Sequence, residues 1–479
     1  MRKAANYDVV ILGSGSTAAA AAKVARRLDK TVLITEERLL GGTCLNYGCV
    51  PSKFLIEAAK AYYTMKRPRF YGIECVESKL VFEDLIQQKN EIVRQYREKK
   101  RDSIADDDGI TLVRGHASFV NSTTIDVEGK QFIGEKILIA TGSRPYVPEI
   151  EGLEKSGYLT SDLLTTDEPG ELTTLPESLV IIGGGYIAIE LGQMFARFGT
   201  KVTMIEKSSR LLSRGYEPEV GELIQKILEE EGIEFLFNAT VDSVSRTKKD
   251  GYHIKVKIGR KLFELTPSHL LVAAGRQPNA DNIQAERAGV EVAEDGYVKV
   301  DEHFRTSQEN IYACGDVIGP ELGNQMATPV GVADAKMAIK NAFSEIGGQI
   351  PDRRVMPRAI FSEPEIATVG LTAEQAAAKG YAVQTRSIPL TWVPRAVMMQ
   401  HTDGLVKIIS DEESEEVIGA TIIGPAAGDL AQQVALGMRF GAKLLDFKDI
   451  MYVYPSMSEA LKFVVRIPPD ESTGDDGDE

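Results

Sequence analysis

The sequence has no long hydrophobic run. No stretch reaches the roughly 18 apolar residues that a membrane-spanning helix needs. The start of the chain, MRKAANYDVVILGSGS, lacks the apolar segment and the small-residue cleavage site of a signal peptide. We therefore expect no membrane association and a cytoplasmic location.

Positive charge is also in short supply. The 55 lysines and arginines are outnumbered by 70 aspartates and glutamates, which gives a formal net charge of −15. A nucleic-acid-binding surface needs clustered Lys and Arg to contact phosphates, so we expect no nucleic-acid partner. Part of the acidic excess lies in the ending DESTGDDGDE, and residues 466–479 are predicted to form a disordered tail.

Cysteine and histidine are scarce too. Four cysteines in 479 residues do not make a disulfide framework. The five histidines are scattered and Cys75 and Cys314 are isolated, so we expect no metal site. The other two cysteines, Cys44 and Cys49, lie together in GGTCLNYGCVPSK. Such a pair favours a catalytic role, and a structural disulfide is the alternative.

An internal repeat organises the chain, whose length implies two to four domains. Both copies read as a strand, a glycine turn, a helix and a second strand that ends in an acid. The copies are YDVVILGSGSTAAAAAKVARRLDKTVLITEE and SLVIIGGGYIAIELGQMFARFGTKVTMIEKS. The corresponding residues are 170 positions apart (183 − 13 = 170): Gly13, Gly15, Ala18 and Glu36 in the first copy, and Gly183, Gly185, Ala188 and Glu206 in the second.

Each copy has the context of a Rossmann dinucleotide-binding unit. Glycines after a buried strand let the backbone approach a pyrophosphate at the positive end of the following helix. The acid lies 21 residues after the second glycine of each copy, where it can accept hydrogen bonds from ribose hydroxyls. Two glycine turns that bind nothing are the alternative.

The cysteine pair follows the first of these acids. PSKFLIEAAKAYY continues as a predicted helix with Pro51 near its first turn. A thiol at a helix N-terminus has a lowered pKa and becomes a nucleophile or an electron donor. A dithiol beside a flavin or nicotinamide can carry two electrons by cycling through a disulfide.

Further strand-ending turns follow each copy: KILIATGSRP at 136–145, HLLVAAGRQP at 269–278 and NIYACGDV at 310–317. Residues 80–105 have helical spacing and heavy charge, so we expect an exposed helix there. From about residue 350, strands such as VMPRAIFS and LVKIIS alternate with two helices. This final α+β region lacks a nucleotide fingerprint, and we expect it to supply a subunit interface.

These linked motifs, GGTCLNYGCVPSK, GSGSTA, GGGYIAIE, ATGSRP and YACGD, resemble those of the class I flavoprotein (pyridine nucleotide-) disulfide oxidoreductases. The likeness covers residues from about 7 to 465. It implies an α/β fold with two Rossmann-like dinucleotide-binding domains, for FAD and NAD(P), followed by an α+β dimerisation domain. The implied bounds are 1–150 and 280–349 for the FAD-binding parts, 151–279 for the NAD(P)-binding domain, 350–465 for the dimerisation domain and 466–479 for the tail.

The resemblance also implies roles for single residues. Cys49 would be the thiol next to the flavin and Cys44 the thiol that faces substrate. Lys53 would lie near the flavin ring, paired with Glu190. The implied cofactor-binding residues are Gly13, Gly15, Ala18, Glu36, Gly42, Thr43, Lys53, Thr141, Gly142 and Asp316 for FAD, with Gly183, Gly185, Tyr186, Glu206, Gly275 and Arg276 in and after the second unit.

Glu206 bears on the choice of nicotinamide. It would hydrogen-bond a free 2′-hydroxyl and repel a 2′-phosphate, which favours NADH. Lys207 and Arg210 follow closely and soften that repulsion, so NADPH remains possible.

The chain departs from the family pattern near its C-terminus. Thiol-reducing members place there a His, five residues before a Glu, that acts as base from the partner subunit. In YVYPSMSEALKF the corresponding residues are Tyr454 and Glu459. A phenol, with a reference pKa of about 10, is a poor general base at neutral pH. Dithiol–disulfide exchange of the ordinary kind is therefore not expected.

Mercuric reductases within this family also carry Tyr at that position, and their VPRA segment resembles TWVPRAVMMQHTDG here. Two thiolates can hold a soft metal ion as the electron acceptor, with no leaving thiol to protonate. The C-terminal cysteine pair and N-terminal CxxC domain of those enzymes are absent from this sequence. We predict a homodimer that reduces such an acceptor, with a dihydrolipoyl-type or other small disulfide as the alternative and a non-catalytic flavoprotein as a weaker one.

Overall fold

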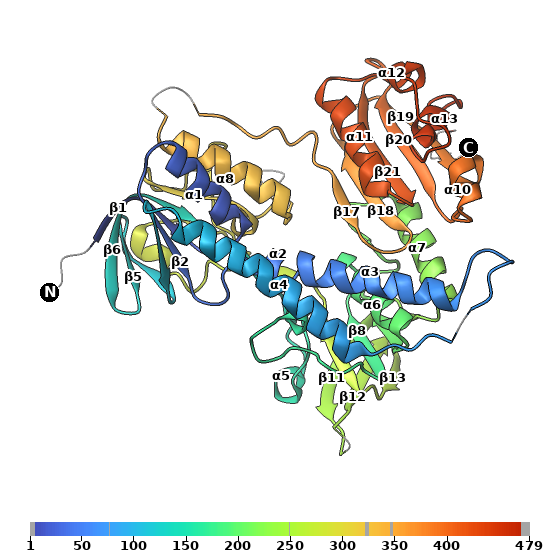
Figure 1. Cartoon of the computed structure of the whole chain (residues 1–479), viewed down its shortest axis with the longest axis horizontal. Helices are drawn as coiled ribbons and strands as arrows, with labels where there is room; N and C mark the ends of the chain where they lie inside the picture. The colour runs from blue at the N-terminus through green and yellow to red at the C-terminus, as the bar shows by residue number, and fades with distance from the viewer. Residues whose placement is uncertain (1–4, 76, 249, 321–324, 345–347, 471–479) are drawn as a thin grey trace.

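The computed structural model describes residues 5–75, 77–248, 250–320, 325–344 and 348–470. Figure 1 shows three regions, with the long helices α3 (Cys49–Lys66) and α4 (Phe82–Ala105) crossing the centre of the view. Two of the regions contain parallel sheets with helices, and the third contains an antiparallel sheet. The predicted fold class, two Rossmann-like units followed by an α+β region, is confirmed.

The first sheet is built around the first copy of the repeat. Its strands run in the order β3-β2-β1-β6-β5-β4, and β16 also pairs with β6. The inner strand β1 is parallel to both β2 and β6, so its apolar run is buried on both faces. The bounds are β1 Ala5–Leu12, α1 Ser16–Arg27, β2 Val32–Glu36, α2 Gly42–Asn46, β3 Ile110–Arg114, β4 Ala117–Asn121, β5 Thr124–Val127, β6 Lys130–Ile139, β16 Ile311–Ala313 and α8 Thr328–Ala342.

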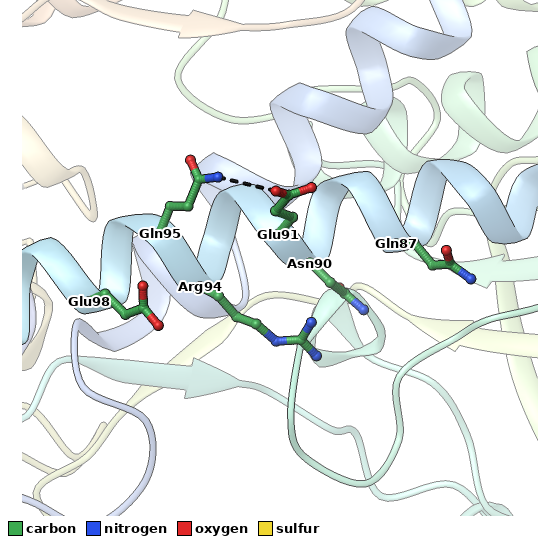
Figure 2. Close-up of a pocket in the computed structure, with 6 residues that line it drawn as sticks. All are labelled: Gln87, Asn90, Glu91, Arg94, Gln95 and Glu98. Atoms are coloured by element: carbon green, nitrogen blue, oxygen red, sulfur yellow. Dashed lines mark hydrogen bonds between the residues drawn. The ribbon is translucent and has the colours of Figure 1, made fainter.

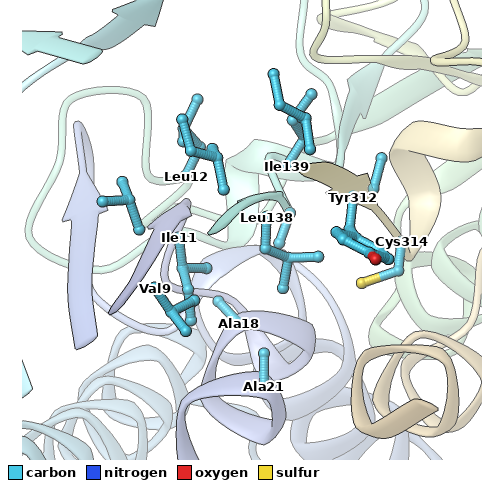
Figure 3. Packing of buried hydrophobic residues seen from close by; sticks show 14 of the residues in the cluster. Val9, Ile11, Leu12, Ala18, Ala21, Leu138, Ile139, Tyr312 and Cys314 are labelled. Atoms are coloured by element: carbon cyan, nitrogen blue, oxygen red, sulfur yellow. The ribbon is translucent and has the colours of Figure 1, made fainter. Parts of the chain in front are cut away.

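Small residues on α1 let this helix pack closely on the sheet (Figure 3). Ala18 and Ala21 lie three residues apart on one helix face, and both are fully buried against β1 and β6. The strand β16 and the helix α8, from after the second unit, return to this core. Burial there raises the pKa of the Cys314 thiol well above its usual value, so Cys314 is a packing residue.

The second copy of the repeat forms its own parallel sheet, in the order β10-β9-β8-β14. Antiparallel strands β11, β12 and β13 stand beside it, and the short strands β7 and β15 pair between the two units. The bounds are β7 Ser143–Pro145, α5 Leu153–Ser156, β8 Ser178–Ile182, α6 Tyr186–Phe198, β9 Lys201–Ile205, α7 Pro218–Glu230, β10 Glu234–Leu236, β11 Ala239–Arg246, β12 Tyr252–Ile258, β13 Lys261–Leu265, β14 His269–Val272 and β15 Arg276–Pro278.

The third region is an antiparallel sheet in the order β17-β18-β21-β20-β19, with α11 packed on β18 and β21 (Figure 1). Its bounds are β17 Arg358–Ile360, β18 Glu365–Gly370, α9 Ala373–Ala378, β19 Val383–Pro389, α10 Pro394–Met398, β20 Leu405–Asp411, β21 Val417–Gly424, α11 Ala427–Arg439, α12 Leu444–Asp449 and α13 Glu459–Val464. It exposes several large apolar side chains: Leu436, Phe440, Leu445, Ile450, Met451 and Val453. Exposed apolar side chains of this kind are typical of an interface.

Helix α4 corrects one expectation. One face of this helix is buried, with Ile86 and Val93 at 4% and 0% exposure, although the sequence suggested an exposed helix. Lys89 is also fully buried. Its ammonium donates to Leu164 O at 2.8 Å and pairs with Glu171 at 2.7 Å, and these contacts compensate for the loss of water. Lys89 lies between Ile86 and Val93 on the buried face of the helix, and its charge interrupts the apolar spacing by which this face could have been recognised in the sequence.

A buried ion network joins the second and third regions. Arg197 on α6 pairs with Glu231 at 2.6 Å and also with Glu363, from the loop between β17 and β18. Gln193 donates to the carbonyl of Glu363 at 2.7 Å. All three ionised side chains are at most 8% exposed, so Arg197 depends on these two carboxylates for its charge partners, while Glu363 also pairs with Arg69 at 2.9 Å.

The predicted tail at 466–479 is only partly described. Asp470 accepts hydrogen bonds from Thr385 Oγ1 at 3.0 Å and Ser387 N at 3.2 Å, and Arg386 donates to Ile467 O. Residues 466–470 are therefore bound to β19, contrary to the expectation of disorder. The rest of the predicted tail, 471–479, lies outside the described residues.

Candidate active site

The two cysteines lie at the junction of two helices. Cys44 is in the middle of the short helix α2, and Cys49 is the first residue of α3. The chain can bring α2 so close to the first glycine turn because residue 42 has no side chain: a Cβ at Gly42 would lie 2.7 Å from Gly15 Cα. The first residue of the helix that carries Cys44 is thus packed against the turn that opens α1.

The two sulfurs are thiols, and they share a hydrogen bond. That bond, from Cys49, is the main reason why the pKa of Cys44 is lowered to about 6, with Thr328, Lys53 and Lys100 adding to the effect against burial. The same bond and burial raise the pKa of Cys49. The pair therefore loses one proton readily and holds the second tightly.

This coupling gives a testable pH profile. We expect the rate at which iodoacetamide alkylates Cys44 in NADH-reduced enzyme to rise with a midpoint near pH 6, because only the thiolate reacts. Below that pH the thiol is protonated and the rate falls. Mass spectrometry of the modified peptide measures the rate, with a model thiol, whose midpoint is about pH 8.5, as control. A profile that follows the model thiol would contradict the coupling.

Lys53 and Glu190 form an ion pair in the structure, as the family resemblance implied. Lys53 Nζ on α3 lies 2.7 Å from Glu190 Oε2 on α6, and Glu190 is 5% exposed. The other carboxylate oxygen of Glu190 accepts from Phe361 N at 2.9 Å. Lys53 also lies 4.7 Å above the ring of Phe361. The ion pair links the cysteine-bearing helix to the second unit.

The first glycine turn has the form of an anion site. Gly13 has φ of +103°, and a Cβ there would lie 2.5 Å from Ala140 O. Gly15 caps α1, and the position of its missing Cβ has nothing within 4 Å, which leaves room for a ligand. Glu36 at the end of β2 accepts from Ser14 Oγ at 2.5 Å and from Arg38 N at 2.8 Å.

The second glycine turn repeats this arrangement. Gly183 has φ of +123° beside Ala273 O, and Gly185 caps α6 with open space at its Cβ position. Glu206, directly after β9, accepts from Ser208 N at 2.7 Å. Tyr186 is the first residue of α6 and is 40% exposed. The two predicted units therefore present the same elements.

Three strand-ending turns meet between the units. Asp316 accepts from Ser143 Oγ at 2.6 Å, and Arg276 donates to the same hydroxyl at 2.8 Å. Thr141 Oγ1 donates to Asn279 O at 2.6 Å. Gly142 and Gly275 have φ of +70° and +129° in the turns that carry these residues. Ala18 lies in α1 behind the first turn, and Thr43 precedes Cys44 in α2.

Tyr454 and Glu459 are not brought to the cysteines within one chain. Figure 1 shows α13, which begins at Glu459, at the edge of the third region and away from α2. Tyr454 is 69% exposed, whereas Glu459 is 5% exposed and accepts from Ser456 N at 3.4 Å. The exposed Tyr454, next in the chain to the exposed Val453, is available to a second chain.

A hollow of about 650 Å³ on α4 is separate from this arrangement (Figure 2). It is lined by residues of α4 alone: Gln87, Asn90, Glu91, Arg94, Gln95 and Glu98. None of the predicted site residues contributes to it. Within the described ranges, no helix is long and apolar enough to cross a membrane, and no group of three or more His, Cys, Asp or Glu is placed to hold a metal ion.

Comparison with known proteins settles the family. The model for the pyridine nucleotide-disulphide oxidoreductases matches residues 7–342, and that of the family's dimerisation domain matches residues 356–464. The chain belongs to the pyridine nucleotide-disulphide oxidoreductase family. The predicted family membership and enzyme class are confirmed, and this family is FAD-dependent and uses NAD(P)H.

Relatives within the family have several activities. The mercuric reductase of Bacillus cereus is 37% identical over 96% of this chain and 71% of its own length. The dihydrolipoyl dehydrogenase of Bacillus subtilis is 33% identical over 96% of this chain and 97% of its own. A solved Cu(II) complex of RclA, a HOCl-induced flavoprotein disulfide reductase of Escherichia coli, matches with a TM-score of 0.84 and 31% identity, over 96% of this chain and 99% of that one.

The residues present fit the family's flavin cofactor. The space at Gly15 lies beside the unpaired N–H groups that open α1, where a helix N-terminus favours a phosphate. Several residues in these sites were missed from the sequence, among them Ser14, Ser143 and Thr328. Single hydroxyls carry no pattern of their own, and Thr328, 4.0 Å from the sulfur of Cys49, comes from a distant helix.

Proposed function

We propose that this chain is an NADH-dependent flavoenzyme that passes two electrons through Cys44 and Cys49 to a soft metal ion. The observation that carries the proposal is a thiol pair that loses its first proton readily. At position 454, where thiol-reducing members of the family have a histidine base, this chain has a tyrosine. A metal-ion acceptor has no leaving thiol to protonate, so it needs no such base.

The chain's own residues have defined parts in this proposal. Bound flavin supplies the two-electron step between nicotinamide and sulfur. Gly13, Gly15 and Glu36 seat its phosphates and ribose, while Lys53, held by Glu190, places a positive charge near the ring. Asp316 holds the chain that joins ring and phosphates. Cys49 would be the thiol next to the flavin and Cys44 the thiol that faces the acceptor.

The second unit binds the nicotinamide donor in the same proposal. Gly183 and Gly185 open α6 for the pyrophosphate, and Tyr186, exposed at its start, covers the nicotinamide pocket. Glu206 accepts from the 2′-hydroxyl of NADH. Electrons balance: NADH gives NAD⁺, a proton and two electrons, which reduce one Hg(II) to Hg(0) or two Cu(II) to Cu(I).

The proposed domains follow the same division. Residues 1–150 and 280–349 form the FAD-binding parts, 151–279 the NAD(P)-binding domain and 350–465 the dimerisation domain. A second copy of the chain would bring Tyr454 and Glu459 to the cysteines. The exposed position of Tyr454, close in the chain to the exposed Met451 and Val453, supports this dimer.

The relatives support a metal-ion acceptor without deciding it. Mercuric reductases are among the most similar curated proteins, and RclA has been solved as a Cu(II) complex, also for a cysteine-to-serine mutant. Dihydrolipoyl dehydrogenases are somewhat less similar, at 33% and 32% identity.

The test is an acceptor panel under nitrogen. NADH or NADPH oxidation by purified holoenzyme is followed with Hg(II), Cu(II), lipoamide and glutathione disulfide. We expect a metal ion to be the best acceptor, NADH to be the better donor, and lipoamide turnover to be very slow. Tyr454→His is expected to raise lipoamide turnover by about a hundredfold, because it restores a general base.

Two outcomes would reject the proposal in different ways. Brisk lipoamide turnover by the unaltered enzyme would make it a dihydrolipoyl-type disulfide reductase. A flavoprotein that takes up only two electrons per flavin in an anaerobic NADH titration, and shows no long-wavelength thiolate-to-flavin band, would be non-catalytic.

A further inference from the structure

One cation beside the cysteine pair has no part in the mechanism above. Lys100 lies on α4, and its Nζ donates to Ser14 O, in the first glycine turn, at 2.7 Å. One turn earlier, Arg97 Nε donates to Asn46 Oδ1, at the end of α2, at 3.0 Å. Residues three apart share a helix face, so this face of α4 holds both the glycine turn and the cysteine-bearing helix.

The segment between these two anchors carries Cys44. Asn46 is fully buried, and its amide donates to the carbonyls of Leu39, Leu40 and Gly42. Gly42 in turn contacts Gly15. Helix α2 is therefore fixed at its first residue against the glycine turn and at its last residue against α4, which leaves Cys44 between them.

The charge of Lys100 is directed at this segment. Lys53 has its charge matched by Glu190 at 2.7 Å, whereas Lys100 makes no salt bridge within the part of the chain that the structure describes. Burial lowers the pKa of Lys100 to about 8, while Glu36 and Cys44 raise it and Lys23 lowers it. Of the two anions that favour the charged ammonium, Glu36 has the larger effect and lies on β2, and Cys44 lies on the segment held between the glycine turn and α4.

We infer that Lys100 is a positioning residue that holds the first glycine turn and supplies, from the same chain, the positive charge that favours Cys44 in its nucleophilic form. The inference rests on the proposed role of Cys44 as the acceptor-facing thiol. Lys100 thus stabilises the thiolate of Cys44 from α4, although the chain has no histidine at position 454.

The experiment compares three variants as holoenzymes. Lys100→Met removes the charge and keeps the length, Lys100→Arg keeps the charge, and Lys99→Met changes the exposed neighbour on α4. The rate constant for alkylation of Cys44 by iodoacetamide is measured at pH 5, below the midpoint of the thiol, after reduction by NADH, with mass spectrometry identifying the site. FAD content and melting temperature are recorded for each variant.

We expect Lys100→Met to slow alkylation at pH 5 about five- to tenfold, because loss of a positive charge in a partly buried site raises the pKa of Cys44 and the thiolate fraction falls with it below the midpoint. Lys100→Arg should remain within about twofold of the unaltered enzyme, and Lys99→Met should not differ. Equal rates in Lys100→Met and the unaltered enzyme would overturn the inference. The inference would also be overturned if the Met and Arg variants lost FAD and melting temperature equally while alkylation stayed unchanged. A merely structural role of Lys100 gives that pattern.

The measurement contains no electron acceptor. If the acceptor panel fails and alkylation still depends on Lys100, the proposed function falls and the inference about Lys100 stands. If the panel succeeds and the alkylation rate does not depend on Lys100, the proposed function stands and the inference about Lys100 falls.

Discussion

Cys49→Ser is expected to lower the turnover of every acceptor, measured as kcat/KM, by at least about a thousandfold. Serine cannot form the disulfide, so electrons reach no further than the flavin. Cys49 begins α3, shares a hydrogen bond with Cys44 and lies 4.0 Å from Thr328 Oγ1, so the substitution acts on the thiol pair itself. The same substitution should reduce electron uptake in an anaerobic NADH titration to two per flavin.

Cys75→Ser is the matched control for this prediction. Cys75 is an exposed cysteine between α3 and α4, and its replacement should leave turnover unchanged. Undiminished turnover in Cys49→Ser, with FAD still bound, would mean that metal ions take electrons directly from the flavin and that the cysteine pair is not on the path.

The second large effect is a pair of complementary defects. Gly13→Ala is expected to yield a protein without FAD, because its Cβ would lie 2.5 Å from Ala140 O in a left-handed backbone conformation. Gly183→Ala puts a Cβ 2.4 Å from Ala273 O in the second unit. This variant should keep its FAD and lose NADH binding, with KM for NADH raised at least about tenfold.

Flavin absorbance and NADH titration measure the two defects. Gly129→Ala is the control, since Gly129 has φ of +79° but nothing within 4 Å of its Cβ position, and it tests backbone strain without a clash. Strain alone costs about 1 kcal/mol and should leave both cofactors bound. Loss of FAD from Gly183→Ala but not from Gly13→Ala would show that the two units had been assigned in the wrong order.

Local patterns predicted much of this molecule from the sequence. The two glycine turns, the acids that end β2 and β9, and the thiol pair at the start of α3 were each recognisable because strand, turn and helix are consecutive in the chain. The pairing of Lys53 with Glu190 came from the family resemblance, since 137 residues separate them and no local rule connects α3 to α6.

Long-range contacts account for what the sequence did not reveal. Lys100 and Lys89 looked like solvated charges on an exposed helix, yet one reaches Ser14 and the other is fully buried against residues 164–171. Their partners are 86 and 75–82 residues away, so helical spacing alone could not identify them. The anchoring of Asp470 to β19 was hidden for the same reason, inside a stretch with the composition of a tail.

The ion network of Arg197, Glu231 and Glu363 has a consequence for the evolution of the chain. The last domain is not freely interchangeable, because a chimera that imports it with an apolar residue at 363 leaves the buried guanidinium of Arg197 with Glu231 as its remaining carboxylate partner. Recombination between relatives should therefore succeed where α6 and the β17–β18 loop are inherited from one parent.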